Sequence, residues 1–548
     1  MKWKKTDGKD CIKSFLASNG LKSEAEVERF LNFSKKDLRK TYKDLDAVVE
    51  QLIDSLNKKE KIVIYGDYDA DGINATVISL RALRRLGADV DFFINDRFVE
   101  GYGLNVKGME KVLSKFPNVK LIFTCDNGIA AQEGIKYALD RGIKVVCSDH
   151  HRQKGEIIVP TVDEWRDDED LDAREECCGA EIARRVMMRL YEKKNVQDEE
   201  FIDSLLAFSG IATVTDSVKF TAANHYLVKE TLKLLKNPPF AILKLMLQIL
   251  EVNDVDEETI GFSIGPLFNA MSRVNGSCDE LVNLLMEDVM ALDTYDRMMS
   301  LVANNNTRKE MTTENLERAK EQLNPEDLCI VLAGKFDPGI AGLVASNVVE
   351  EYSRPCICLN LKDGIYKGSA RTFEDFDLKE ALDKCADLLL GYGGHAGAAG
   401  LSLSPEKLDE FKDRMNKLVK ESGILDEEPC IAIDYETSIK NVWDEKIEQL
   451  LSFAPFGMGF RKPNIAYYGS FSKVKLLPTK EKVKKHVMFE LSDEDVKITC
   501  CWWNAIERWT KFYSEAKMKS VKILGCPKIE EYNGDLKTKI SIQDIKMA

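Results

Sequence analysis

Residues 61–72 read KIVIYGDYDADG, a short apolar run that leads into an acidic turn ending in glycine. The run has the composition of a strand that is buried on both faces. Apolar side chains then recur at helical spacing from Thr76 to Leu86. A buried strand that passes through a tight turn into a helix predicts an α/β fold built on a parallel sheet.

Two further units of the same kind follow along the chain. The run Leu121–Cys125 precedes a predicted helix at about residues 130–141, and Lys144–Cys147 is a third buried run. This alternation predicts a parallel sheet that is covered by helices on both faces. Residues 1–60, before the sheet, have the spacing of helices, with a capped helix start at Ser23.

Acidic residues and histidines follow each of the three predicted strands. They are Asp67, Asp69 and Asp71 after the first strand, Asp126 after the second, and Asp149, His150 and His151 after the third. In an open parallel sheet, the carboxyl ends of neighbouring strands open into one crevice. The topology therefore brings five carboxylates and two of the chain's five histidines to one place.

This concentration of carboxylates indicates a metal site, because several carboxylates cannot stay ionised close together without a positive charge among them. Lysines are scarce in these loops. Carboxylate and imidazole ligands without thiolate suit Mn²⁺ or Mg²⁺, and two such ions form a hydrolytic centre for phosphate esters. A single DxDG turn is more often a capped turn than a ligand; three clusters at successive strand ends favour the metal centre.

Length and composition exclude several classes of protein. The chain has 548 residues, 44% hydrophobic and 31% charged, which suits about three folded domains. No apolar run reaches the length of a membrane span, and the N-terminus has no apolar segment of a secretory signal. The fourteen cysteines include no CxxC spacing and fit thiols in a reducing compartment. We therefore expect a cytoplasmic protein with no membrane partner.

The C-terminal part of the chain is basic, although the whole chain has a net charge of −14. Residues 461–548 hold 18 Lys and Arg against 11 Asp and Glu, and six lysines lie between Lys473 and Lys485. Nearby aromatic residues are Tyr467, Tyr468, Trp502, Trp503, Trp509 and Phe512. Lysines interleaved with aromatics predict a groove for single-stranded nucleic acid. The alternative interpretation is a solvated hairpin beside the core aromatics of a small barrel.

The motifs, taken together, resemble the DHH phosphoesterase superfamily. Four of its motifs are similar to GDYDADG (66–72), CDNGI (125–129), SDHH (148–151) and TVTDS (213–217). The DHH-associated C-terminal domain is similar to GSAR (368–371) and GGHAGAAG (393–400). Segments of the RecJ single-stranded-DNA exonucleases are similar to CCGAEIA (177–183), IGPLFNAMSRV (264–274) and APFGMGFRKP (454–463). The similarity runs in order from about residue 10 to the end of the chain.

The resemblance and the composition together predict four segments. The stretch Leu281–Leu323 contains no Pro or Gly, which favours one long helix between two domains. The segments are residues 1–278 with N-terminal helices and the DHH catalytic domain, 279–325 with the connecting helix, 326–425 with a DHH-associated substrate-binding domain, and 426–548 with an OB-like barrel that binds single strands.

The resemblance also implies a role for individual residues. Asp69 and Asp126 would hold one metal ion, and Asp71, Asp126, His150 and Asp216 the other. Asp67, Asp149 and His151 would support these ligands or contact the substrate. The implied phosphate contacts are Arg97, Arg273, Ser369 and Arg371, with Gly393, Gly394 and His395 beside the scissile phosphate. The implied activity is 5′→3′ hydrolysis of single-stranded DNA to 5′-mononucleotides in DNA repair and recombination.

Three positions depart from the pattern of the family. Tyr65 stands where many relatives have a histidine before the first acidic motif, and Asp337 stands where histidine is common. Residues 160–172 lack the usual Asn-Pro step. The glycine-rich run 391–400 predicts backbone amides that approach a phosphate at a helix start, with a close helix–helix contact as the alternative.

Three functions remain open at this point. The first is a single-stranded-DNA exonuclease that is a monomer, has two Mn²⁺ or Mg²⁺ ions, and has a single-stranded-DNA-binding protein or a helicase as partner. The second is a DHH phosphodiesterase for short RNA or small nucleotides, which the extra C-terminal domain disfavours. The third is a replication scaffold without activity, which the intact acidic motifs disfavour.

Overall fold

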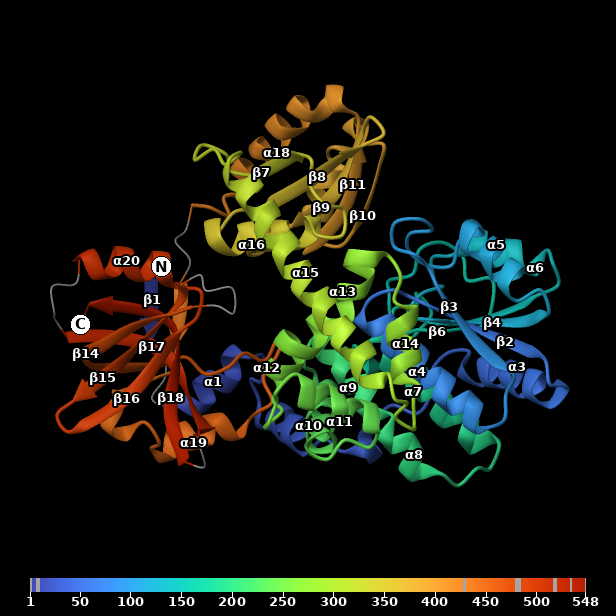
Figure 1. Ribbon diagram of the computed structural model, residues 1–548, viewed down its shortest axis with the longest axis horizontal. Helices are drawn as coiled ribbons and strands as arrows, with labels where there is room; N and C mark the ends of the chain where they lie inside the picture. Colours follow the sequence, from blue (N-terminus) through green and yellow to red (C-terminus); the bar gives the residue numbers. More distant parts are fainter. Residues whose placement is uncertain are drawn as a thin grey trace. The chain divides into compact units, whose positions relative to one another are not determined.

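A computed structural model describes residues 2–5, 10–426, 430–478, 484–515, 520–532 and 535–547 (Figure 1). The chain divides into two compact units. One unit holds Ser34–Val218 and the residues from Tyr226 to the end of the second α/β domain. The other holds the N-terminal residues through Phe33, the segment Lys219–His225 and the C-terminal domain. Each unit is described by itself below.

The first domain of the larger unit contains the predicted parallel sheet. Its five strands are all parallel, in the order β3-β2-β4-β5-β6. The strands are β2 (Lys61–Gly66), β3 (Val90–Ile94), β4 (Val119–Cys125), β5 (Lys144–Ser148) and β6 (Thr161–Val162). The strands β2, β4 and β5 are those predicted from the sequence, and β3 and β6 extend the sheet at its two edges.

Helices cover both faces of this sheet, as predicted. Alternate side chains of β2 enter two separate cores: Ile62 and Ile64 pack with α3, α4 and α7, whereas Val63 and Tyr65 pack with α5 and α6. The helices are α3 (Leu45–Lys58), α4 (Ala70–Arg85), α5 (Val106–Lys115), α6 (Gln132–Leu139), α7 (Gly179–Lys193), α8 (Glu199–Ser204) and α9 (Leu206–Thr215). Burial on both faces explains why the strands read as continuous apolar runs.

A helical region follows the sheet and leads to the second domain. It consists of α10 (Ala222–Lys236), α11 (Ala241–Ile249), α12 (Glu257–Thr259), the π-helical turn η3 (Ile260–Ile264), α13 (Gly265–Asn275), α14 (Asp279–Leu285) and α15 (Thr294–Lys320). The long connecting helix predicted between the two domains is α15, but its predicted bounds, 279–325, are wrong, because the chain breaks between α14 and α15. At the end of α14, the guanidinium of Arg81 in α4 donates to the carbonyl of Leu285 and pairs with Asp288.

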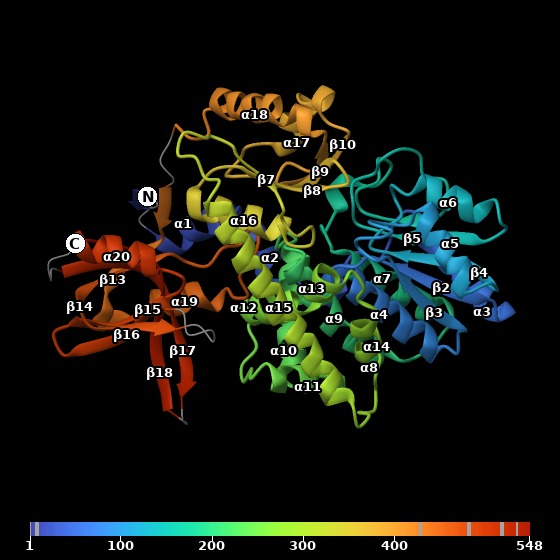
Figure 2. The ribbon, with the colours of Figure 1, turned by 45° about the horizontal axis from the view of Figure 1, so that its top comes forward.

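The second domain is a five-stranded sheet in the order β10-β11-β9-β8-β7. Its strands are β7 (Ile330–Gly334), β8 (Cys356–Lys362), β9 (Ile365–Arg371), β10 (Gly391–Gly394) and β11 (Ala398–Leu403). Figure 2 shows α17 (Leu378–Asp383) and α18 (Leu408–Ser422) on one face and α16 (Ala341–Tyr352) on the other. The glycine-rich run is the β10–β11 hairpin, so both the predicted helix start and its helix–helix alternative are wrong.

The C-terminal domain is a closed five-stranded barrel, as the OB prediction requires. Strand β14 pairs with both β15 and β17, and this second pairing closes the barrel. Its strands are β14 (Ile465–Pro478), β15 (Lys484–Asp493), β16 (Val496–Trp502), β17 (Ser520–Tyr532) and β18 (Asp535–Met547). The further elements of the domain are β12 (Cys430–Ile433), β13 (Tyr435–Ser438), α19 (Glu445–Ser452) and α20 (Ile506–Glu515).

The N-terminal segment belongs to this C-terminal unit. Strand β1 (Lys2–Lys5) pairs with β12, and α1 (Cys11–Ser18) and α2 (Glu24–Asn32) follow it. The ring of Phe15 stacks on Phe453 with 6.2 Å between centroids, and the amide of Arg461 donates to Asn19 at 2.8 Å. The predicted first segment, 1–278, is therefore wrong at its N-terminal end, although Ser23 begins α2 with a capping box as expected.

Two predictions from composition can be compared with the described residues. Within them, no helix has the length and apolarity that a membrane crossing needs. The fourteen cysteines are thiols rather than disulfides, and most of them are buried, as expected for small core residues.

Candidate metal centre

The acidic turn after β2 is built by local backbone constraints. The Asp69 carboxylate accepts hydrogen bonds from the amides of Asp71 and Gly72, at 3.0 and 3.1 Å, and so caps the start of α4. A Cβ at Gly72 would lie 2.5 Å from the carbonyl oxygen of Asp67, so only glycine fits there. The cap and the glycine together hold three carboxylates at the carboxyl end of β2.

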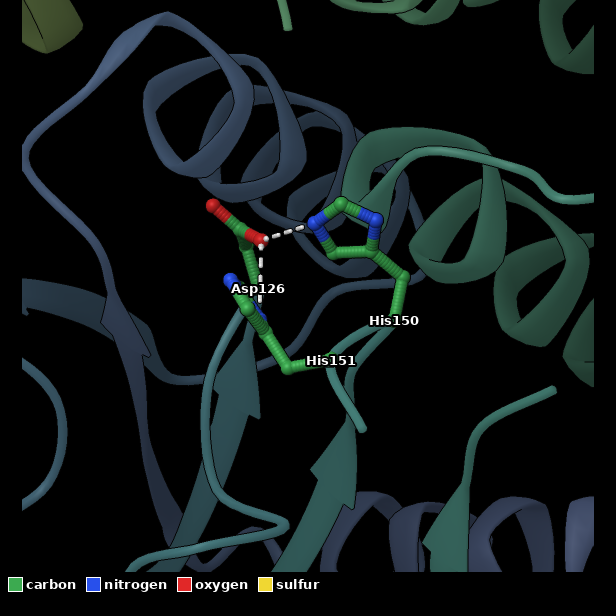
Figure 3. A group of neighbouring side chains, drawn as sticks. All are labelled: Asp126, His150 and His151. Carbon is green, nitrogen blue, oxygen red and sulfur yellow. Dashed lines mark ion pairs between the residues drawn. The ribbon is translucent and has the colours of Figure 1, made fainter. Parts of the chain in front are cut away.

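Asp126 lies at the centre of the site. Its backbone is in the left-handed region, with φ of 62°, and its amide donates to the carbonyl of Ser148 at 3.0 Å. The Nε2 atom of His150 is 3.1 Å from Asp126 Oδ1, and Nδ1 of His151 is 4.0 Å from the same oxygen (Figure 3). Asp126 is 2% exposed, and its Oδ1 accepts no hydrogen bond among the described residues.

The remaining side chains form two groups around Asp126. In the first group, His150 Nε2 lies 3.4 Å from Asp71 Oδ2 and 3.8 Å from Asp216 Oδ2. The amides of Gly179 and Ala180, at the start of α7, each donate to Asp71 at 2.7 Å. In the second group, Asp67, Asp69 and Asp126 place one carboxylate oxygen each within 4.8 Å of the others. The structure thus brings together all five metal ligands that the sequence suggested, with Asp67 as a further neighbour.

The electrostatics of the site favour the binding of cations. Burial, and then the charges of Asp71 and Asp69, raise the pKa of Asp126 well above its ordinary value. Burial likewise raises the pKa of Asp67, and it raises that of Asp216 to about 7. Burial lowers the pKa of His150, but Asp71 and Asp216 outweigh it and raise that pKa to about 9. Carboxylates this close bind protons or cations, because their mutual repulsion must be offset.

The residues fit two divalent cations. The buried oxygens Asp67 Oδ1 and Asp126 Oδ1 have no hydrogen-bond partner among the described residues, and such atoms are costly unless a ligand satisfies them. The donors are carboxylates and one imidazole, which suit Mn²⁺ or Mg²⁺. Asp126 belongs to the second group and adjoins the first through His150, a position that suits a carboxylate shared by two ions.

Asp149 and His151 adjoin these groups, and His151 offers a ring nitrogen within 4.8 Å of ligand atoms of Asp126 and His150. Asp149 Oδ1 is 2.8 Å from His151 Nδ1, and Asp149 Oδ2 accepts from the amide of Ile129 at 2.9 Å. Burial raises the pKa of Asp149, but the charge of His151 outweighs it and holds that pKa below its ordinary value. The Tyr102 hydroxyl lies 3.3 Å from the His151 ring nitrogens. Asp149 therefore orients His151, and Tyr102 is a contact that sequence patterns gave no reason to expect.

Asp163 is a further buried carboxylate that sequence analysis missed. It follows β6 directly and lies where the Asn-Pro step of the family is absent. Its Oδ1 accepts from the amide of Trp165 at 2.6 Å, and burial and then Asp149 raise its pKa. A strand of two residues leaves no apolar pattern, so nothing in the sequence marks Asp163 as a residue at the end of a strand.

Arginines gather beside the metal centre, as the resemblance implied. The Arg97 guanidinium lies over the Tyr68 ring at 4.7 Å, and Arg273 Nη1 donates to the carbonyl of Gly339 at 3.1 Å. Burial, followed by the charges of Arg97 and Arg371, lowers the pKa of Arg273 to about 9. Such mutual repulsion marks a site that is suited to an anion.

The second domain contributes to the same region. His395 lies in the β10–β11 turn, after Gly393 and Gly394; its amide donates to Ala398, and its Nδ1 accepts from the amide of Gly397 at 3.1 Å. Burial, and then the charges of Arg371, Arg152 and His151, lower the pKa of His395. Ser369 lies in β9, two residues before Arg371, paired with Gly400 of β11. His395 therefore lies within electrostatic range of both His151 and Arg371.

The two substitutions within family motifs have structural explanations. The Tyr65 hydroxyl donates to Asn95 Oδ1 at 2.5 Å, and the ring packs with Phe93 on the opposite face of the sheet from Ile64. Tyr65 is thus a core residue and offers no ligand to the metal centre. Asp337 accepts from the Asn315 side chain at 2.7 Å, and its amide donates back to Asn315 at 3.0 Å, which ties its loop to α15.

A third set of potential ligands is structural. Glu164, Glu175 and Cys177 approach one another in the buried interior. Glu164 accepts from the amides of Glu175 and Cys177, and Glu175 pairs with Arg185 at 2.9 Å. Glu175 has an arginine partner and both oxygens of Glu164 accept from backbone amides, so this set gives no reason to expect a metal ion.

The C-terminal aromatics divide between core and surface. Trp502, Trp509 and Tyr467 are buried in the barrel, and Phe512 packs against that core. Trp503 is 52% exposed and Tyr468 is 38% exposed. Of the two adjacent tryptophans, Trp502 therefore belongs to the core and Trp503 to the surface. Residues 479–483 of the basic run lie outside the described residues.

Gly179 offers a test of the geometry around Asp126. A Cβ at this position would lie 2.7 Å from both Cβ and Oδ1 of Asp126. We expect Gly179→Ala to lower the rate of metal-dependent phosphodiester hydrolysis at least about tenfold, because small displacements of catalytic groups are costly. Gly261→Ala is the control, since the nearest atom to its Cβ would be Val214 Cγ1 at 3.7 Å. Equal rates for the two variants would contradict this geometry.

Comparison with known families divides the chain into three matched domains. The DHH family N-terminal domain matches residues 61–211, the DHHA1 domain matches 327–421, and the RecJ OB domain matches 433–544.

The chain is also similar, over most of its length, to known proteins and solved structures. The single-stranded-DNA-specific exonuclease RecJ of Dickeya dadantii is 30% identical and covers 82% of each chain. That of Bacillus subtilis is 28% identical over 97% of this chain and 67% of its own length. The structure of an exonuclease RecJ bound to manganese is 29% identical, with a TM-score of 0.60 over 71% of this chain and 99% of the other. The fold also matches RecJ from Thermus thermophilus, at 24% identity and a TM-score of 0.78, over 97% of this chain and 75% of that one.

Proposed function

The chain belongs to the RecJ family of DHH-type exonucleases, and from this premise we propose that it is a single-stranded-DNA-specific exonuclease. The observation that carries the proposal is the convergence on one site of strand-end carboxylates, a cluster of arginines and His395 from a second domain. Carboxylates bind metal ions and arginines bind phosphates, so the site is suited to a nucleic-acid backbone.

The two groups around Asp126 would hold two Mn²⁺ or Mg²⁺ ions. Asp69 and Asp126 would hold one ion, with Asp67 beside them, and Asp71, Asp126, His150 and Asp216 the other. Such ions, when bound, polarise a phosphoryl oxygen and make water a nucleophile at neutral pH. Asp149 holds the ring of His151 by a hydrogen bond, so His151 can face the substrate in a fixed orientation.

The arginines and the hairpin would hold the strand. Arg97, Arg273 and Arg371 would bind the phosphate at its 5′ end, since guanidinium groups match phosphate oxygens in pairs. His395, together with Gly393, Gly394 and Ser369, would lie beside the scissile bond. Cleavage of the first internucleotide bond from this end releases 5′-mononucleotides with 5′→3′ polarity. A cytoplasmic location, a monomeric state, a single-stranded-DNA-binding protein or helicase as partner, and a role in DNA repair and recombination stay predictions.

Digestion of labelled oligonucleotides tests the proposal. Single-stranded DNA and RNA of several lengths, with 5′ or 3′ labels, are incubated with Mn²⁺, with Mg²⁺ or with EDTA. We expect stepwise release of mononucleotides from the 5′ end of DNA, in the presence of metal only. Preference for two- to five-nucleotide RNA would instead indicate the alternative, a phosphodiesterase for short RNA or small nucleotides. Binding without hydrolysis would indicate a scaffold.

Trp503 is an exposed aromatic residue of the barrel domain whose ring is suited to stacking on a base. Its ring is exposed, and its edge-to-face neighbour is His486, with 5.0 Å between centroids. We expect Trp503→Ala to weaken binding of a long single strand about tenfold, because stacking on an aromatic ring contributes about 1–3 kcal/mol per base. Ile529→Ala is the control, since Ile529 is also 52% exposed but has no ring.

Fluorescence anisotropy at fixed salt measures both affinities. Unchanged affinity for Trp503→Ala would exclude a stacking role for this ring. The point substitution is preferable to deletion of the barrel, because Phe15 and Phe453 pack together and a deletion would expose the N-terminal segment.

A further inference from the structure

The first turn of α7 holds residues of the candidate metal centre. The amides of Gly179 and Ala180 each donate to the Asp71 carboxylate at 2.7 Å. The residue before the helix, Cys178, does not cap these amides with its side chain, so Asp71 takes the place of a cap. A Cβ at Gly179 would lie 2.7 Å from Asp126, so the same turn packs closely against the centre of the site. The position of this turn therefore affects two candidate ligands.

The chain enters α7 through a backbone conformation that needs support. Glu176, just before the helix, has a φ of 54°, in the left-handed region. Residues other than glycine seldom adopt this region, and they keep it only where the surrounding structure holds them there. The amides on either side of Glu176, those of Glu175 and Cys177, donate to the two oxygens of Glu164 at 3.1 and 2.9 Å. One carboxylate thus holds both sides of the left-handed residue.

The Glu164 side chain links this segment to the parallel sheet. Glu164 is fully buried and lies two residues after β6, which pairs with β5 through Val162 and Ser148. The two ligand groups around Asp126 do not include Glu164. Its carboxylate therefore connects the sheet, whose strand ends form the metal centre, to the helix that holds Asp71.

A second set of contacts keeps the same segment in place without Glu164. The side chain of Glu175 accepts from the amide of Arg39 at 2.8 Å and from Arg185 of α7 at 2.9 Å, and Arg185 also pairs with Glu181 of that helix. Loss of Glu164 would leave two buried amides without acceptors, which is costly. Because the contacts of Glu175 would remain, we expect such a loss to displace the start of α7 rather than to unfold the domain.

We propose that Glu164 is a positioning residue for the two-ion centre. It fixes the segment that leads into α7 and, through the first amides of that helix, the orientation of the Asp71 carboxylate. The inference rests on the proposed function and deepens it, because it names a residue outside both ligand groups on which metal binding depends. Residues that orient metal ligands typically change metal affinity or activity about 10- to 100-fold when they are replaced.

Titration calorimetry with Mn²⁺, in the absence of DNA, tests this inference. We expect Glu164→Gln to weaken the binding of at least one ion about tenfold, because the glutamine side chain turns N–H donors toward one of the two backbone N–H groups. The rate of hydrolysis at saturating single strand should fall by a similar factor at limiting Mn²⁺. KM for the strand should stay unchanged, because the buried Glu164 side chain cannot contact DNA.

Tyr191→Phe is the matched control. Tyr191 is also buried and lies near the other end of α7, where its hydroxyl donates to the carbonyl of Ala82 at 3.0 Å. This substitution removes one buried hydrogen bond from the same helix but leaves the turn beside Asp71 intact. We expect wild-type Mn²⁺ affinity and an unchanged rate of hydrolysis.

The outcomes separate a displaced ligand from a lost fold. A partly unfolded sample binds fewer ions per chain, whereas a displaced ligand raises the dissociation constant. Unchanged Mn²⁺ affinity in Glu164→Gln, or an equal loss in Tyr191→Phe, would overturn the inference. If Glu164→Gln does not fold, Glu164→Asp decides. It keeps both oxygens on a side chain that is one carbon shorter, and wild-type Mn²⁺ affinity in this variant would overturn the inference as well.

The exonuclease function is tested independently of Glu164. Mn²⁺ binding is measured on the full chain without DNA, and hydrolysis of single-stranded DNA is measured on the wild-type protein. A wild-type protein that binds Mn²⁺ but leaves single-stranded DNA intact would contradict the proposed function, and the effect of Glu164 on metal affinity would still stand.

Discussion

The variant Asp126→Asn is expected to lose at least about a thousandfold in the rate of hydrolysis, while its fold is retained. Asp126 is a candidate ligand together with Asp67 and Asp69 on one side and with His150 and His151 on the other, and it lies 3.1 Å from His150. An amide removes the charge that a shared carboxylate brings to two cations, and metal stabilisation of a phosphoryl transition state is worth several kcal/mol. Single-turnover release of mononucleotides from a labelled strand, with saturating Mn²⁺, measures the loss.

Two further measurements on Asp126→Asn distinguish lost chemistry from lost structure. Titration calorimetry with Mn²⁺ should show weaker or fewer binding events than in the wild type. The melting temperature without metal should rise, because burial and neighbouring carboxylates make the ionised Asp126 unfavourable in the folded state. The control Asp140→Asn changes an exposed carboxylate at the end of α6 and should leave all three quantities unchanged. Retention of a tenth of the wild-type rate by Asp126→Asn would contradict a two-ion centre.

The metal centre could be predicted from the sequence because it depends on topology. The acids after β2, β4 and β5 follow recognisable apolar runs, and the carboxyl ends of parallel strands meet at one edge of a sheet. Neither step requires knowledge of side-chain packing. Asp216 lies outside this logic, at the end of α9, and came from the family resemblance alone.

The features that sequence analysis missed depend on contacts between distant residues. The end of α14 is fixed by Arg81, roughly two hundred positions earlier, and no local pattern records that contact. The N-terminal helices read correctly as helices, but α1 packs through Phe15 against the ring of the distant Phe453.

We expect circular single-stranded DNA to remain undigested over the time in which the protein fully digests the same DNA after linearisation. The site is built from both domains of the larger unit: His395 lies within electrostatic range of His151, and the Arg273 side chain donates to the carbonyl of Gly339. The proposed role of the arginines is to anchor a terminal phosphate, which carries more charge than an internal diester. On that proposal the strand enters by its end, and a closed circle offers no such end for hydrolysis.

The same geometry predicts the response to base pairing. A duplex is wider than a single strand and keeps its bases stacked. Digestion should therefore stop where it reaches a hairpin stem, and it should not begin at a 5′ end that lies within a stem. The experiment measures the release of acid-soluble nucleotides from one circular single strand. The strand is used intact, or after cutting at one restriction site to which an oligonucleotide has been annealed, followed by denaturation. The cut molecule supplies the control for sequence, length and metal. Equal release from the circle and the linear strand would show that cleavage begins internally, and that the arginines bind backbone diesters rather than a terminus.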